Sequence, residues 1–91
     1  MKMMPVKVIE VEDEGMLSLL GKQVEIRCNV YIYTGVLVGV NTTCVKLQDA
    51  AIVYETGEFS GKKYKDAQRL GGDQYVSMGL IESFGESNKE Y

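Results

Sequence analysis

The sequence contains no histidine and no tryptophan, one proline and two cysteines. The absence of histidine excludes the commonest general base, the Ser-His and Cys-His nucleophile pairs and the usual zinc ligand. Cys28 and Cys44 form no CxxC motif and no metal-ligand spacing, which is typical of buried thiols in a reducing, intracellular setting. We therefore expect a cytoplasmic protein that is not an enzyme and that binds neither a metal nor a cofactor.

An excess of positive charge is also lacking, since 10 Lys and Arg residues face 13 Asp and Glu residues and the net charge is -3. This balance excludes a broad electrostatic attraction for phosphate backbones, so any nucleic-acid site must be local. The longest apolar run, residues 30–40, is about half the length that a membrane helix needs. The opening residues, MKMMPVKVIEVEDE, contain no apolar stretch of the secretory kind. Neither a signal peptide nor a membrane partner is predicted.

Apolar residues make up 45% of the 91 residues and charged residues 25%, which predicts a packed core in a single domain. A domain this small buries only about two-thirds of its extended surface, which favours self-association. We divide the chain into an N-terminal extension (residues 1–15), a domain (16–84) with a polar insertion (55–74), and a C-terminal tail (85–91). The last six residues, ESNKEY, should fray.

Hydrophobic periodicity predicts one short helix followed by five strands. The apolar residues of the segment 16–20 have helical spacing, and acidic residues precede them as at a helix N-terminus. From Gln23 the period changes to two, so Val24 and Ile26 point to one face and Glu25 to the other, solvent-facing side. On the third predicted strand Val45 and Leu47 face inward. Strands are predicted at 23–28, 31–40, 44–54, 75–78 and 80–84. Residues 6–11, VKVIEV, fit either a short extra strand or the lead into the helix.

The second predicted strand is apolar on both faces, and it carries Gly35 and Gly39 on one of them. Glycines in a strand mark a sharp bend or a close approach of another backbone. The predicted fold class is therefore all-β with a short N-terminal helix, in which five strands form a strongly bent antiparallel sheet that closes into a small SH3-type barrel. The exposed edges of so short a sheet invite strand pairing between subunits.

One basic and aromatic cluster occurs in the chain, formed by Lys62, Lys63, Tyr64 and Lys65. It fits either a solvated hairpin tip or an auxiliary contact with RNA. The first interpretation is favoured, because three lysines are few against the overall negative charge.

Four segments occur in a characteristic order: LLGKQVEIRC (19–28), YTGVLVGVN (33–41), LQDA (47–50) and, after the polar insertion, RLGGDQYVSMGLIESF (69–84). They are similar to the helix and first strand, the first motif, the end of the third strand and the second motif of the Sm and LSm superfamily of small ring-forming RNA-binding proteins. The resemblance covers residues 16–84. It implies an Sm-like barrel, a closed homo-oligomeric ring and single-stranded RNA as a partner.

The resemblance also implies a site. The family holds a uracil base with an acid and an asparagine from the first motif and an arginine from the second. Here Asn41 replaces the acid, Cys44 or Val45 falls in the asparagine's place, and Met78 replaces the arginine. The RNA contacts expected from the resemblance are Asn41, Thr43, Cys44, Met78 and Gly79.

In the family the fourth strand of one subunit pairs with the fifth strand of the next. The resemblance therefore places a subunit interface at Tyr75, Val76, Leu80, Ile81 and Phe84. The alternative is that these residues complete the core of the monomer.

Two functions follow from these observations. The first is a homo-oligomeric ring that binds RNA or helps RNAs and proteins to assemble, with a degenerate uridine pocket. The second is a ring retained as a structural or protein-interaction module after the loss of RNA binding, which the acidic composition and the substituted pocket favour.

Overall fold

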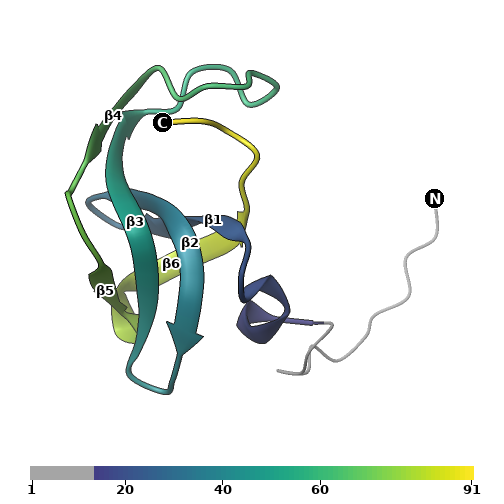
Figure 1. Cartoon of the computed structure of the whole chain (residues 1–91), viewed down its shortest axis with the longest axis vertical. Coiled ribbons are helices and arrows are strands. Elements are labelled where there is room, and N and C mark those ends of the chain that lie inside the picture. Colours follow the sequence, from purple (N-terminus) through teal and green to yellow (C-terminus); the bar gives the residue numbers. More distant parts are fainter. Residues whose placement is uncertain (1–13) are drawn as a thin grey trace.

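The structure is a computed structural model, and it describes residues 14–91. Within this range six strands form one antiparallel sheet, accompanied by two single turns of 3-10 helix (Figure 1). The strands are β1 (Gln23–Cys28), β2 (Ile32–Val40), β3 (Cys44–Glu55), β4 (Asp66–Arg69), β5 (Gln74–Ser77) and β6 (Ile81–Glu86), and the 3-10 turns are η1 (Met16–Leu19) and η2 (Met78–Leu80). The alternatives for residues 6–11 concern a segment outside the described residues.

The segment predicted to form a short helix is the 3-10 turn η1, and residues 14–91 contain no α-helix. Gly15 and Gly21 flank this turn with φ angles of 72° and 82°, outside the range of a right-handed helix and favoured by glycine. The hydroxyl of Ser18 also donates to the carbonyl of Gly15 at 2.7 Å, a local bond that competes with helical bonding. So few residues between such ends do not sustain an α-helix.

The strand order is β4-β3-β2-β1-β6, and β5 also pairs with β3. The long strand β3 pairs with β5 through residues 44–47 and with β4 through residues 51–55, so β4 and β5 share one edge of the sheet. β6 pairs with β1 and forms the other edge. Among the described strands none joins β6 to β4 or β5, so the sheet is strongly bent but does not close on itself.

The bend lies where Gly35 of β2 crosses β3. A Cβ atom on Gly35 would lie 3.0 Å from the carbonyl oxygen of Gln48 and 3.2 Å from the Cβ of Leu47, so the predicted close approach is confirmed here. The pairing register of the two strands shifts at this point, and Asp49 opposite has a φ angle of 56°. At Gly39 a Cβ would make only an ordinary 3.5 Å contact, so close approach does not explain that glycine.

The core is built from residues of η1, β1, β2, β3 and β5. Val24 and Ile26 of β1 and Val45 and Leu47 of β3 are fully buried, which confirms the inward faces predicted from their alternation. The core cluster consists of Met16, Val24, Ile26, Leu37, Val45, Leu47, Ala50 and Val76. No helix of the described residues is long and apolar enough to cross a membrane.

The C-terminal residues pack against the loop between β3 and β4, and the prediction that they fray is wrong. The amide of Glu90 donates to the carbonyl of Lys62 at 2.9 Å, and the amide of Tyr64 donates to the carbonyl of Glu90 at 3.0 Å. Ser87 and Lys89 are buried. Figure 1 shows the yellow C-terminal segment running back to the end of the sheet where this loop lies. Main-chain pairing therefore holds a polar segment that has little apolar surface of its own.

Candidate functional site

The turn between β2 and β3 is shaped by the side chain of Asn41. Its Oδ1 atom accepts hydrogen bonds from the Thr43 amide (2.7 Å), the Thr43 hydroxyl (2.9 Å) and the Cys44 amide (2.9 Å). This is the side-chain turn that asparagine favours. The Oδ1 atom is thus occupied inside the chain, which leaves the side-chain NH2 group of Asn41 at the surface.

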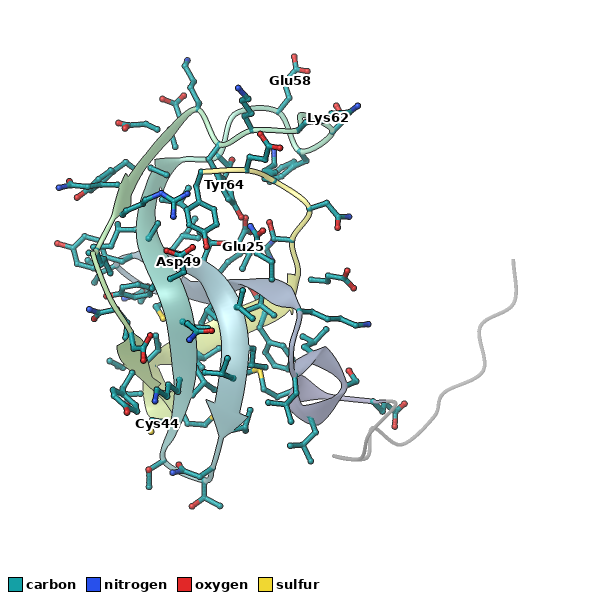
Figure 2. The ribbon with its side chains drawn as sticks, in the orientation of Figure 1. Glu25, Cys44, Asp49, Glu58, Lys62 and Tyr64 are labelled. Carbon is teal, nitrogen blue, oxygen red and sulfur yellow. The ribbon has the colours of Figure 1, made fainter. Side chains whose placement is uncertain are left out.

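The second predicted turn lies beside the first. The amide of Met78 donates to the carbonyl of Thr43 at 2.8 Å, and Cys44 pairs with Ser77 across β3 and β5. All five predicted RNA contacts, including the exposed Gly79, therefore lie at one end of the sheet, where Figure 2 labels Cys44. None of the five carries a positive charge, so these residues offer no cation for a phosphate.

An apolar hollow of about 430 Å³ lies next to these turns. It is lined by Met16, Leu17, Val40, Asn41, Thr42, Met78 and Phe84. The hollow joins two of the predicted RNA contacts to Phe84, a predicted interface residue on the edge strand β6. We call it the β6 hollow.

A second apolar hollow, of about 300 Å³, lies beside the edge strand β5 and is called the β5 hollow. Its lining includes Val30 and Tyr31 from the β1–β2 hairpin, Tyr75 from β5 and Leu80 from η2. Tyr75 is 65% exposed and Leu80 66% exposed. Burial raises the pKa of the Cys28 thiol, which also lines this hollow. A raised pKa favours the protonated form of this thiol.

The predicted interface residues separate into two groups. Val76 is 5% exposed and belongs to the core cluster, so for this residue the alternative of a core position is correct. Ile81 is half-buried and packs against the same cluster. Tyr75, Leu80 and Phe84 are exposed large side chains along the two edges of the sheet. These three exposed residues are the most accessible to another subunit, so the interface prediction now rests on them.

At the opposite end of the sheet a buried polar cluster lies under the C-terminal segment. The Tyr64 hydroxyl donates to Glu25 Oε1 at 2.9 Å and lies 2.7 Å from the Ser87 hydroxyl (Figure 2). An Arg27 guanidinium nitrogen lies 2.6 Å from Glu25 Oε2. The strand alternation predicts that Glu25 faces solvent, but Glu25 is 6% exposed because Tyr64 and Ser87 cover it. No pattern in the sequence indicates this cover.

Tyr64 is 7% exposed, so its ring is not presented to a ligand, in contrast to the expectation of an auxiliary RNA contact there. Burial raises the pKa of the Tyr64 hydroxyl, and the hydrogen bond and negative charge of Glu25 raise it further against the lowering effect of Ser87 and Thr34. Tyr64 therefore anchors the loop as a neutral hydrogen-bond donor. Its neighbours Lys62, Lys63 and Lys65 are exposed as expected.

A third cluster fixes the chain end to the bend of the sheet. Arg69 Nη1 lies 3.0 Å from Asp49 Oδ1, and the guanidinium carbon of Arg69 lies 4.9 Å from the centre of the Tyr91 ring. The Tyr91 hydroxyl donates to the carbonyl of Asp49 at 2.7 Å. These contacts hold the strand bulge at Asp49, so we assign the cluster a structural role.

The described part of the chain contains no group of three or more Cys, Asp and Glu side chains that could hold a metal ion. Comparison with models of known families finds no match, and comparison with curated proteins finds none either. The features of the described residues that bear on function are the two apolar edges, the turns beside them and the polar end.

Proposed function

We propose that this chain is an Sm-like protein that assembles with copies of itself into a closed ring. The observation that carries the proposal is the pair of open sheet edges, each beside its own apolar hollow. An open edge presents unpaired N–H and C=O groups to another strand, and natural proteins seldom leave such an edge bare. Apolar side chains next to both edges add a second reason for association.

The two surfaces are different, and this difference favours a ring over a two-fold dimer. Tyr75 and Leu80 lie beside β5, whereas Phe84 and Met16 line the hollow beside β6. A two-fold contact brings identical surfaces together, while a head-to-tail contact joins two different ones and closes into a ring when the rotation allows it. Pairing of β5 with β6 of the next copy would continue the bent sheet across each boundary and complete an Sm-like barrel.

A mixing experiment tests the head-to-tail contact. Leu80→Glu places a charge beside β5, and Phe84→Glu places one beside β6, so each variant alone should be a monomer with one intact surface. Mixed in equal amounts, the two should form a complex of one copy of each, measured by native mass spectrometry. Circular dichroism of each variant checks that it folds. If the mixture stays monomeric while both variants are folded, head-to-tail assembly is wrong.

RNA binding at the turns is a second candidate, favoured by one observation. The hydrogen bond between Met78 and Thr43 brings both turns together, with the amide group of Asn41 at the surface. Fluorescence anisotropy with oligo-U and oligo-A at two salt concentrations tests this candidate, with Asn41→Ala as the variant that should weaken it. No binding at tens of micromolar protein in low salt would leave a ring that binds proteins or serves as a scaffold.

A further inference from the structure

We infer that the turn between β3 and β4 is a separate binding site for single-stranded nucleic acid, with Phe59 as its stacking surface and Lys62 and Lys63 as its phosphate contacts. Figure 2 places Glu58 and Lys62, which belong to this turn, at the end of the sheet opposite Cys44. The site is therefore distinct from the turns at Asn41 and Met78. It does not depend on ring assembly.

Phe59 is the most exposed large apolar residue among those described, with 83% of its surface accessible. It lies at the tip of a turn that is closed by a 3.0 Å hydrogen bond from the Gly61 amide to the Glu58 carbonyl. Lone exposed leucines and valines are common on protein surfaces. An aromatic ring held out on an ordered turn is a different case, because it offers a flat face to a planar ligand.

The turn is fixed before any ligand binds. The Lys89 ammonium donates to the carbonyl oxygens of Thr56 and Glu58, and the Glu90 amide donates to the carbonyl of Lys62. Lys89 is itself buried, although lysine is rarely buried unless paired. A pre-ordered loop loses little conformational entropy on binding, so the contacts that it makes translate more fully into affinity.

Charges of both signs surround the turn, where Glu55 pairs with Lys65 at 3.3 Å and Glu58 forms no ion pair with any residue of the range 14–91. A polar hollow of about 370 Å³ beneath Phe59 contains Arg27, Lys62 and Lys89 among its lining, together with Glu25 and Glu86. Both carboxylates are already paired within the chain, Glu25 with Arg27 at 2.6 Å and Glu86 with Lys22 at 3.7 Å.

Lys62 and its neighbour Lys63 form no ion pair with any residue of the range 14–91. On a chain of net charge -3, these two free ammonium groups outnumber the one free carboxylate of the turn, that of Glu58, and can attract an anion locally.

The combination of an exposed aromatic side chain with free lysines points to nucleic acid rather than protein. Proteins that bind single strands without sequence preference stack bases on aromatic rings and follow the phosphates with lysines and arginines. An acidic protein surface would use Lys62 and Lys63 but would leave Phe59 exposed. A partner with an apolar pocket would use Phe59 but would not need the lysines or the polar hollow. A base with its phosphate uses all of these features.

Phe59→Trp provides a direct probe, because the chain has no other tryptophan. Short oligo-U and oligo-dT should quench the fluorescence of the new indole, and raising the salt concentration should weaken the effect. The two oligomers distinguish RNA from DNA as the preferred strand. In anisotropy titrations Phe59→Ala should lower the affinity about tenfold, the loss expected for one stacked base.

Lys62→Gln combined with Lys63→Gln should lower the affinity further and flatten its salt dependence. Lys46→Gln is the matched control, since it also removes a lysine charge but its ammonium pairs with Asp73 on another part of the sheet. Asn41→Ala should leave the quenching of the Phe59→Trp protein unchanged, which separates this site from the turns at the other end. The mass of the protein assembly in solution tests the proposed ring independently of nucleic-acid binding.

The inference is overturned if the oligomers do not quench the indole, or if Phe59→Ala binds them as tightly as the wild type. It is also overturned if polyglutamate competes as well as oligo-U while Phe59→Ala has no effect, because an acidic protein would then be the partner. Phe59 is exposed, so its variants should fold, and circular dichroism checks that they do.

Discussion

The two ends of this small sheet satisfy their surfaces in opposite ways. At the end under the C-terminal segment, Glu25, Tyr64 and Ser87 bond to one another, and no buried side-chain nitrogen or oxygen in the described range lacks a partner. Toward the other end, β5 and β6 leave their outer edges unpaired, and Tyr75, Leu80 and Phe84 remain exposed beside them. The buried polar groups of the first end are satisfied within the chain, whereas the apolar edges at the second end are incomplete.

A domain of this size cannot bury all of its apolar surface, and in this chain the unburied part lies along the edges of the sheet. A few polar residues, running from Ser87 to the end of the chain, cover one end through main-chain hydrogen bonds. The apolar edges cannot be completed in that way, because a further strand is required. Association should therefore depend on the edges and be insensitive to changes at the polar end.

The largest expected effect comes from breaking the apolar edge. Tyr75→Asp places a charge beside β5, so this variant should be a folded monomer if copies assemble through this edge as proposed. Val38→Asp is the control, because Val38 is also an exposed apolar strand residue but lines neither hollow. Size-exclusion chromatography with light scattering measures both. A Tyr75→Asp protein with the same mass as the Val38→Asp protein would contradict the edge assignment.

The next largest effect comes from breaking the polar end. Tyr64→Ala removes a buried aromatic side chain and leaves Glu25 with one partner fewer, so the free energy of unfolding should fall by about 3–5 kcal/mol. Phe59→Ala, in the same loop but exposed, should change it by no more than about 0.5 kcal/mol. Urea unfolding measures the two values. Equal losses for both variants would mean that Tyr64 does not anchor the loop.

A smaller effect is expected at the bend between the two ends. Gly35→Ala forces a methyl group against the Gln48 carbonyl and Leu47, which should lower the free energy of unfolding by about 1–3 kcal/mol. Gly39→Ala meets only an ordinary contact and should be close to neutral. The same unfolding assay compares them. The bend assignment fails if Gly39→Ala is the more damaging of the two.

The smallest effect is a dependence on alkaline pH. The folded protein raises the pKa of Tyr64 above the ordinary value of about 10, chiefly through burial. Its contribution to stability is therefore complete below about pH 10 and is lost as the pH rises from there through the raised pKa of the folded state. Tyr64→Phe should lose less stability than the wild type over that window in urea unfolding at stepped pH. Identical slopes would show that Tyr64 titrates normally.

Much of the sheet can be predicted from the sequence, because a strand with one buried face alternates visibly. β1 matches its predicted bounds, and β2 and β3 differ from theirs by a single residue. β4 lies inside the segment predicted as a polar insertion, since this short strand contains one apolar residue, Ala67. The 3-10 turn at Met16–Leu19 replaces a predicted helix because the flanking glycines leave it too short.

The site is predicted less completely. The order of the motifs correctly brings Asn41 and Met78 to one end, since both follow strands that pair with β3. Val76 and Tyr64 are buried instead of presented to partners, because exposure depends on neighbours from distant parts of the chain. Phe59 could have been found from the sequence, since an aromatic residue between Gly57 and Gly61 in a polar stretch marks an exposed turn.

The absolute mass of the wild-type protein in solution, measured by light scattering over a dilution series, tests the central claim most directly. The account predicts one species that contains a fixed number of chains, three or more, and that persists on dilution. A monomer at every concentration would contradict the claim that the open edges of β5 and β6 are completed by other copies, and a two-chain species would contradict their head-to-tail pairing.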